Sequence, residues 1–540
     1  MSDRPLVIAG GPILTMAQPA RVEAVTVRDD RVAWAGSLEE CRDRAGPESQ
    51  ERDLGGRALL PGFVDPHIHP LMLGQTSAWV DVGPEAAPSI EAMVERLRGH
   101  AATLPAREAV RGYGYDLRRI AERRHPTAAE LDRAAEDCEV TVMHASGHGG
   151  VVNSMVLGRA GITVDTPDIP GGDIGRAPVG TPNGLLMDAA WDLLAGPEGV
   201  RTGRHGPNIH HAEPPAALLG HLERAQVAIL RAGITTVADA QVTRRETETW
   251  LAIRDAGRLD LRVHLYVLSS LLDEVLALGL VGSLGDDRLR FAGIKLYADG
   301  TLVGRTAWFP DGYPGDPDER GLLYHEPSAF TALLVRAHAA GLQTATHALS
   351  PAAIGLVVDA VEQAAHVRPR PDARHRIEHC ALPTIEDVAR MAGLGIVPVA
   401  QSQHAHAYGD GAIAAVGEEL GQRYHPLGLY AKAGVRFALS SDAPVAPPDP
   451  LRAVQAAVER RTVLGTALGP DELRVDVGRA LRACTIDAAW ACHAERSVGS
   501  IEPGKLADFV VLSADPTSVP TEAIASIRVE ETWSGAQPVP

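Results

Sequence analysis

Residues 58–70 read ALLPGFVDPHIHP, an apolar run that closes on two histidines and a proline. Seven further short runs of aliphatic and β-branched residues follow it, and most precede an Ala-, Leu-, Arg- and Glu-rich stretch with helical spacing. They are GITTVADA (233–240), LRVHLYVL (261–268), FAGIKLYADG (291–300), GLQTATHA (341–348), RIEHC (376–380), GIVPVAQSQ (395–403) and VRFALSSDAP (435–444). Strands that alternate with helices form a parallel sheet, and eight of them predict an α/β fold of the TIM type, a closed (β/α)8 barrel.

The chain outside these runs predicts one insertion and two terminal appendages. A long stretch separates the first run from the second, and we expect it to be a large insertion after strand 1 that covers the active-site face. Both ends of the chain contain short alternating segments broken by turns, such as EAVTVRDDRVAWAG at 23–36. The expected boundaries are 1–57 and 496–540 for the terminal β elements, 58–70 for barrel strand 1, 71–230 for the insertion and 231–495 for the rest of the barrel.

The composition argues against several classes of protein. The net charge of −18 repels phosphate backbones and anionic lipid heads, so we expect neither a nucleic-acid nor a membrane partner. No apolar run approaches the roughly 20 residues of a membrane span, and the first residues do not resemble a signal peptide. The five cysteines are widely spaced with no CxxC pair, which argues against a disulfide scaffold or a zinc ribbon. We therefore expect a cytoplasmic protein.

Two histidines close the first run. In a strand, alternate side chains share one face, so His67 and His69 can both point inward toward one metal ion. Chance alone gives about one HxH in a chain with this many histidines, so the spacing by itself is a weak signal. The position is more informative, because a polar pair that closes an apolar strand is an unusual choice for packing.

Four other strand candidates carry a polar residue in the equivalent place: Lys295, His347, His379 and Asp442. Taken singly, each has a structural explanation, since a histidine can be a hydrogen-bonded core residue, Lys295 can extend to solvent and Asp442 can cap the next helix. Together they indicate one site, because the carboxyl ends of barrel strands converge on one pocket. Four imidazoles and a carboxylate suit two divalent metal ions, with zinc favoured over Mn, Fe or Co.

A lysine in such a site needs a chemical reason, because an ammonium group repels metal ions. Burial lowers the pKa of an amine, and the neutral amine can react with carbon dioxide to form a carbamate. The carbamate is an anion that can bridge two metal ions. Carbamylation would therefore explain why Lys295 belongs to this set.

The motifs VDPHIHP, GIKLYADG, THA, RIEHC and SSDAP, followed by GSIEPGKLADFVVL at 499–512, resemble the amidohydrolase superfamily. Within it, the chain is similar to the YtcJ-like branch, which includes N-substituted formamide deformylases. The resemblance extends from residue 5 to residue 516 and includes the insertion segments 131–162 and 170–186. It implies a (β/α)8 barrel with a small β-sandwich built from both termini, a binuclear metal centre and, as is common among relatives, a homodimer.

The resemblance also implies a role for each site residue. His67, His69 and Asp442 would hold one metal ion. His347 and His379 would hold the other, and carbamylated Lys295 would bridge both. The implied reaction is hydrolysis of a non-peptide C–N bond, in an amide or an N-substituted formamide, by a hydroxide held between the metal ions. Asp442 would act first as general base and then as general acid.

Substrate contacts are expected from segments near the barrel mouth. Aromatic residues there suggest a bulky apolar leaving group, although they can equally pack the insertion onto the barrel. The polar candidates have structural alternatives too, such as a turn, a cap or a surface salt bridge. One departure from the family pattern affects this region, because relatives usually show HxxGD where this chain has HALSP at 347–351. The candidates are Tyr113, Tyr115, His148, Tyr297, Asp299, Arg305, Trp308 and His404.

Two other functions compete with amide hydrolysis. A hydrolytic deaminase of an aminated heterocycle uses the same barrel, but it usually holds one metal ion and places a glutamate shortly after the fifth-strand histidine. The segment THALSPAAIG offers no such glutamate, and Lys295 favours two metal ions. The second alternative is an inactive metal-binding regulator, and six intact ligand positions argue against it, because one missing ligand usually cripples such a centre.

Overall fold

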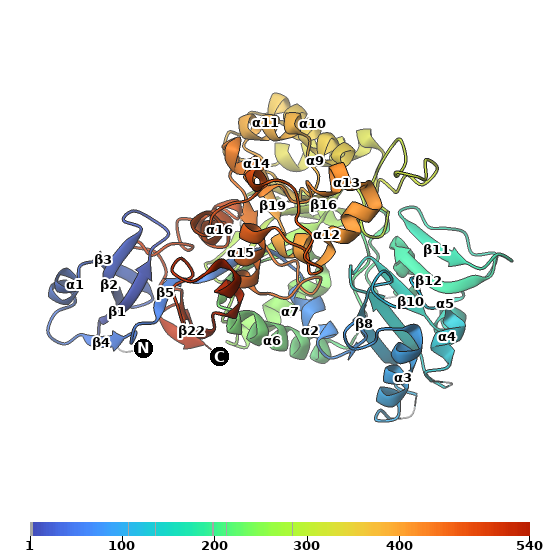
Figure 1. Cartoon of the computed structure of the whole chain (residues 1–540), viewed down its shortest axis with the longest axis horizontal. Helices are drawn as coiled ribbons and strands as arrows, with labels where there is room; N and C mark the ends of the chain where they lie inside the picture. The colour runs from blue at the N-terminus through green and yellow to red at the C-terminus, as the bar shows by residue number, and fades with distance from the viewer. Residues whose placement is uncertain are drawn as a thin grey trace.

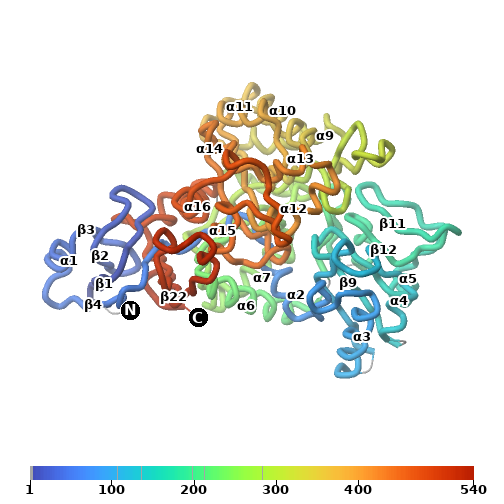
Figure 2. The backbone as a smooth tube through the Cα atoms, in the orientation of Figure 1, coloured from blue at the N-terminus to red at the C-terminus, as the bar shows by residue number. Residues whose placement is uncertain are grey.

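The computed structural model describes residues 4–105, 107–135, 137–196, 199–211, 213–282 and 284–539. Three parts of the chain lie side by side in Figure 1: a β-sheet built from both termini, a central barrel with its helices, and the insertion on the opposite side of the barrel from the termini. The tube in Figure 2 shows the two chain ends close together beside the terminal sheet.

Eight strands of the nine-stranded central sheet are parallel, each to its neighbours. The ninth, β15 (Leu284–Gly285), is a short antiparallel strand that pairs with β16. Two backbone hydrogen bonds of 2.9 Å join the segment after the last strand to the first strand: Asp442 N donates to His67 O, and His69 N donates to Ala443 O. The expected TIM-type barrel is confirmed. In spatial order the strands are β20 (Ala438–Leu439), β19 (Val397–Ala400), β18 (Arg376–His379), β17 (Gln343–Ala348), β16 (Leu289–Tyr297), β14 (Arg262–Leu268), β13 (Ile234–Val242) and β6 (Phe63–Ile68).

Strand residues alternate between two apolar layers. Ile294 and Leu296 of β16 pack in the outer layer with Phe330 and Leu334 of the following helix. Smaller residues such as Ala238, Ala345 and Val399 fill the inside of the barrel. Because both faces are buried, the strands are almost continuously apolar, as parallel sheets require. The helices around the barrel are α6 (Pro215–Arg231), α7 (Arg244–Asp255), α8 (Leu272–Ala277), α9 (Pro327–Ala339), α10 (Pro351–Val367), α11 (Ile385–Leu394), α12 (Ser402–Val416), α13 (Glu418–Gly421), α14 (Leu427–Lys432), α15 (Pro450–Glu459), α16 (Val477–Ala483) and α17 (Ile486–Ala491).

The two ends of the chain share one eight-stranded sheet. β21 from the C-terminal segment pairs with β5 from the N-terminal segment, with Val510 opposite Leu60. By hydrogen-bond pairing this is a single sheet, and helix α1 (Leu38–Ala45) packs against it. Its strands are β23 (Gln537–Val539), β22 (Val529–Ser534), β21 (Phe509–Leu512), β5 (Ala58–Pro61), β1 (Leu6–Leu14), β2 (Arg21–Arg28), β3 (Arg31–Gly36) and β4 (Gln50–Asp53), the last paired with β1.

The expected barrel strand over 58–70 is divided at Gly62. Residues 58–61 form β5 of the terminal sheet, and the barrel strand β6 begins only at Phe63. The backbone donors change partner at this point, since Gly62 N bonds to Asp508 O of the terminal segment whereas Phe63 N bonds to Gly233 O of the barrel. A Cβ on Gly62 would lie 2.3 Å from the Thr235 hydroxyl, so only glycine fits where the chain crosses between the two sheets.

The insertion has its own sheet and its own apolar core. Six strands lie in the order β11-β12-β10-β9-β8-β7. β11 and β12 form a hairpin within residues 172–188, a stretch rich in glycine and proline. Helix α6, inside the expected 71–230 range, packs with the barrel core through Leu222 and Ile229 instead. The elements are α2 (Pro70–Thr76), β7 (Val80–Asp81), α3 (Ile90–Ala101), β8 (Val110–Tyr115), α4 (Ala128–Asp132), β9 (Val140–His144), β10 (Gly149–Val152), α5 (Ser154–Ala160), β11 (Gly172–Arg176) and β12 (Pro182–Asp188).

None of the helices in the described ranges combines the length and the apolar character that crossing a lipid bilayer requires.

Candidate metal centre

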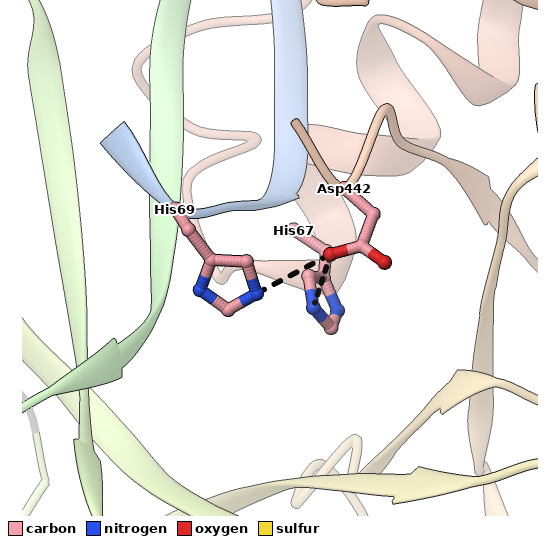
Figure 3. Close-up of side chains that lie close together, drawn as sticks. All are labelled: His67, His69 and Asp442. Atoms are coloured by element: carbon pink, nitrogen blue, oxygen red, sulfur yellow. Dashed lines mark ion pairs between the residues drawn. The ribbon is translucent and has the colours of Figure 1, made fainter. Parts of the chain in front are cut away.

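Three predicted ligands lie together where the first and last barrel strands meet. His67 Nε2 is 3.4 Å and His69 Nε2 is 3.2 Å from the same oxygen of Asp442, Oδ1. Figure 3 shows both imidazoles turned toward this carboxylate, with the histidines on one segment of the barrel and Asp442 on another. Two ligands bound to one zinc ion at about 2.0–2.1 Å lie roughly 3.3 Å apart in tetrahedral geometry. The spacing of these three side chains therefore suits one ion.

A bulge in β6 shapes the segment that carries the two histidines. Val237 of β13 lies opposite Asp65, and Asp239 lies opposite Ile68. Over this interval β6 advances by three residues while β13 advances by two, so β6 contains one extra residue. Such an extra residue turns a side chain away from strict alternation. Asp442 has a similar break in geometry, since its φ of 58° lies in the left-handed region. Both irregularities occur at ligand positions.

The other nitrogen of His67 is held by a buried carboxylate. His67 Nδ1 contacts Glu378 Oε2, and the two side chains are 1% and 0% exposed. Arg376 in turn donates two hydrogen bonds of 2.8 Å to Glu378, one to each carboxylate oxygen. A carboxylate on Nδ1 fixes the tautomer and leaves Nε2 with its lone pair, as is usual for histidines that bind metals.

His347 and His379 form a second pair. His379 Nε2 lies 3.1 Å from His347 Nδ1. His379 Nδ1 contacts Gln401 Oε1 at 2.8 Å, and Gln401 is itself hydrogen-bonded to Ser440 at 2.8 Å. His379 has a φ of 67°, which interrupts the strand at the point where its side chain enters the site. The structure thus brings His347 and His379 to ligand-like spacing, and His379 is also 5.2 Å from His67 between ring centroids.

Lys295 lies on β16 beneath this group. Its ammonium nitrogen is fully buried and finds no hydrogen-bond partner among the described residues. It lies 4.6 Å from the centre of the Tyr297 ring. Burial lowers the pKa of Lys295 to about 8, so a fraction of the amine is neutral near physiological pH. Lysine occurs only three times in the chain, at 295, 432 and 505, against many arginines. Arginine cannot lose its proton, so a chemical need for an amine explains the choice here.

Burial keeps His67, His347 and His379 neutral at pH 7. Burial lowers the pKa of His67 to about 4, and burial likewise holds the pKa of His347 and of His379 well below the usual value. Burial alone would raise the pKa of Asp442, but the facing imidazoles of His67 and His69 lower it below its usual value, so the carboxylate stays ionised. Neutral imidazoles and an ionised carboxylate are the forms that bind metals.

These residues fit a divalent metal centre on observations of this chain alone. Two groups of three ligand atoms, each within 4.8 Å of one another, occur among the described residues: His67, His69 and Asp442, and His379, His404 and Asp442. A buried polar atom without a partner costs about 1–3 kcal/mol. Lys295 Nζ and His404 Nε2 are two such atoms in the part of the chain that is described, and both face this centre.

A cavity of about 70 Å³ opens above the cluster. The ligand candidates except Lys295 line its floor, and His148, Tyr297 and His404 line its walls. Apolar side chains supply much of the rest. They are Met72, Pro207, Ile209, Leu302, Val303, Leu349, Tyr408, Tyr424 and Val445. No Lys or Arg occurs among the described residues of the lining, so Asp442 is its one permanently charged group.

His148 is the best anchored of the substrate candidates in the walls. Its Nδ1 contacts Asp188 Oδ1 at 2.8 Å, and Tyr324 donates a 2.6 Å hydrogen bond to the same oxygen. The imidazole centroid is 5.5 Å from that of His347. The insertion therefore contributes a fixed imidazole to the cavity, as the sequence predicts.

Five of the expected substrate contacts lie outside the cavity lining. The Tyr113 hydroxyl bonds to Ala145 O, and Tyr115 is fully buried in the core of the insertion. Asp299 accepts backbone hydrogen bonds from Leu349 and Ser350, after β17, and from Trp308, in the loop after β16. Arg305 forms an ion pair with Glu319 near the surface. In this structure packing, loop and surface contacts occupy these five side chains, and their contact with substrate stays a prediction.

Sequence reasoning missed the residues that hold the ligands in place. Arg376 and Glu378 are two residues apart in RIEHC, so they share a face of a buried strand, and two opposite charges there are a detectable signal of a site. Gln401 and Ser440 are uncharged, so no comparable pattern in the sequence marks them as residues of the site. Ser441 donates a hydrogen bond to the buried Asp65.

Known proteins resemble this chain over almost its whole length. The amidohydrolase family model matches residues 50–540. N-substituted formamide deformylase from Arthrobacter pascens is 29% identical over 98% of this chain and 97% of its own length. The putative amidohydrolase YtcJ from Bacillus subtilis is 28% identical over 98% of each chain. A crystal structure of an uncharacterized metal-dependent hydrolase from Pyrococcus horikoshii covers 96% of this chain and 99% of its own, at 24% identity and a TM-score of 0.77.

The family match covers far more than half of the chain, and the resemblance expected from the motifs is confirmed. The fold agrees with it, because the structural neighbour superposes over the barrel and its appendages together. The site agrees as well, since ligand-forming side chains converge at the carboxyl ends of the barrel strands. The chain belongs to the amidohydrolase family, and it is a metal-dependent hydrolase.

Proposed function

We propose that this protein hydrolyses a non-peptide C–N bond in an amide or an N-substituted formamide. The observation that carries the proposal is the pair of imidazoles that share one carboxylate oxygen at the floor of an apolar cavity: His67 and His69 at 3.4 and 3.2 Å from Asp442 Oδ1. The relative named N-substituted formamide deformylase, which matches 98% of the chain, supports the choice of bond.

The proposed centre holds two divalent metal ions, and the nitrogen and oxygen donors favour zinc. His67, His69 and Asp442 would hold the first ion. His347 and His379 would contribute to the second, and Lys295, as a carbamate, would supply an anion shared by both. The 3.1 Å spacing of the two imidazoles and the buried, unpaired amine support this assignment among the described residues.

Each residue then has a defined task. Bound metal ions would lower the pKa of water and polarise a carbonyl oxygen. The Asp442 carboxylate accepts the proton that the attacking water loses and returns it to the departing nitrogen. Glu378 holds His67 in one orientation through Nδ1. His148, fixed by Asp188, presents an imidazole to the substrate from the opposite wall.

The lining of the cavity favours a neutral, apolar group on the nitrogen. The described lining offers aliphatic and tyrosyl side chains and no cationic group that could pair with a substrate carboxylate. Burying an unpaired carboxylate costs several kcal/mol. An N-formyl amino acid with a free carboxylate should therefore be a poor substrate compared with the formamide of the corresponding amine.

A matched pair of substrates tests the proposed function. We expect the zinc-loaded protein to release formate from N-benzylformamide, and to turn over N-formylphenylglycine, which adds only a carboxylate, at least about 100-fold more slowly in kcat/KM. Formate and amine are quantified for both compounds. Ammonia released from an aminated heterocycle would instead indicate a deaminase, and a protein that carries metal yet is inert toward amides, formamides and heterocycles would indicate a regulator.

Replacing Lys295 tests the proposed bridge. We expect Lys295→Met to bind the second metal ion more than about 100-fold more weakly, because a bridging anion is lost while the bulk of the side chain is kept. In 13C-bicarbonate the wild-type protein should show a carbamate 13C resonance that Lys295→Met lacks. Lys432→Met, at the exposed end of α14, is the control and should keep both the resonance and two ions. Two tightly bound ions in Lys295→Met would refute the bridge.

A further inference from the structure

His404 lies on the first turn of α12, directly after barrel strand β19. Its imidazole is 5% exposed and lines the cavity. Its backbone N donates to Gln401 O at 3.0 Å, which ties the turn to the residue that orients His379. His406, two residues later, is half-buried and bonds to Arg461 O instead. Residues two apart on a helix point in nearly opposite directions, so only the first histidine of HAH faces the centre.

The ligand nitrogen of His404 faces the same carboxylate as the first metal site. Its Nε2 lies 3.8 Å from Asp442 Oδ2, whereas His67 and His69 face Oδ1. The two oxygens of Asp442 are thus directed to different groups of imidazoles.

His379 completes a second group of three. The ligand atoms of His379, His404 and Asp442 all lie within 4.8 Å of one another, and all three side chains are buried. The two imidazoles are nearly parallel, at an interplanar angle of 19° with centroids 6.2 Å apart. Nδ1 of His379 contacts Gln401 Oε1, so Nε2 is the nitrogen that faces the centre, where it also lies 3.1 Å from His347 Nδ1. Both histidines therefore present Nε2 toward the space beside Asp442.

The unsatisfied nitrogen points to a ligand as well. His404 Nε2 has no hydrogen-bond partner within the described ranges, although it is fully buried. The neighbouring Tyr408 does not supply one, since its hydroxyl donates to Val445 O at 2.9 Å. A buried donor or acceptor left in this state costs about 1–3 kcal/mol, so a native structure usually provides a partner for it.

We propose that His404 is a ligand of the second metal ion. The inference rests on the binuclear centre of the proposed function and extends its ligand set to α12. A substrate contact, the role expected from the sequence, would leave the metal affinity of a His404 variant unchanged. The two roles therefore differ in a measurement that involves no substrate.

Metal titration of matched variants tests the proposal. Metal-free wild-type, His404→Ala, His404→Gln and His406→Ala proteins are titrated with Zn²⁺ by calorimetry, and bound zinc is counted by mass spectrometry. We expect the first ion to bind equally well in all four proteins. The second should bind more than about 100-fold more weakly in both His404 variants, since loss of a ligand exceeds the 10–100-fold effect of a supporting residue. His406→Ala should match wild type.

Separate outcomes identify which idea fails. Wild-type affinity for both ions in His404→Gln would overturn the role of His404 and leave the binuclear centre intact. A wild-type protein that binds one ion or none would overturn both. If the variants do not fold, zinc anomalous scattering from crystals of the unmodified protein locates the bound ions directly. A second ion about 2.0–2.1 Å from His404 Nε2 would support the proposal, and one beyond the reach of that nitrogen would overturn it.

Discussion

In protein saturated with zinc, Asp442→Asn is expected to lower kcat by about 10²–10⁴-fold without loss of the fold. The substitution preserves shape and an oxygen donor, but an amide cannot accept the proton that the reaction must move. Asp442 is suited to that task because the imidazoles of His67 and His69 keep its carboxylate ionised despite burial. The expected loss is in kcat rather than KM, because substrate binding does not depend on proton transfer.

The control for this prediction is Asp449→Asn. Asp449 caps α15 through a 3.0 Å hydrogen bond from Arg452 N, lies outside the cavity lining, and is replaced by an equally good capping residue. Formate release and bound zinc are measured for both variants. A metal-loaded Asp442→Asn protein with near wild-type kcat would show that another group carries the proton.

The barrel and its ligands could be predicted because each strand signal is local. An apolar run that ends on a histidine, a lysine or an aspartate is visible in a short window of sequence. Because the carboxyl ends of barrel strands converge, these terminal residues are then predicted to share one site. His67 and Asp442, which are far apart in the sequence, lie 3.4 Å apart for this reason. His404 was harder to place, because the run that precedes it predicts a strand, and the histidine itself lies on the following helix.

The residues that support the ligands could not be predicted, since their partners are set by closure of the barrel. Glu378 on β18 meets His67 on β6 only across the barrel interior, and no local pattern links them. The division of the run at 58–70 into a terminal-sheet strand and a barrel strand could not be predicted for a similar reason. Both halves are apolar, and the change of sheet at Gly62 depends on donors and acceptors from the C-terminal segment and from the turn before β13.

Glu378→Ala is expected to lower the free energy of unfolding by about 3–5 kcal/mol, because it leaves the Arg376 guanidinium buried without its counter-ion. Both side chains are 0% exposed. Arg376 would keep the Pro66 carbonyl and the face of Tyr266, 4.4 Å away, but neither carries a full negative charge. The same change frees His67 Nδ1, so metal affinity should also fall by about 10–100-fold.

Two further variants separate the contribution of the Glu378 charge to stability from the other effects of the substitution. Glu378→Gln keeps the shape and one acceptor oxygen, so it should lose less stability than Glu378→Ala, and the difference between the two reports the charge-independent contacts. Glu108→Ala, at an exposed position, should change the free energy of unfolding by no more than about 0.5 kcal/mol. Urea unfolding of the metal-free proteins measures all three, so that metal binding does not contribute. A Glu378→Ala protein as stable as Glu108→Ala would mean that Arg376 finds another partner, and His67 would then need another source of its orientation.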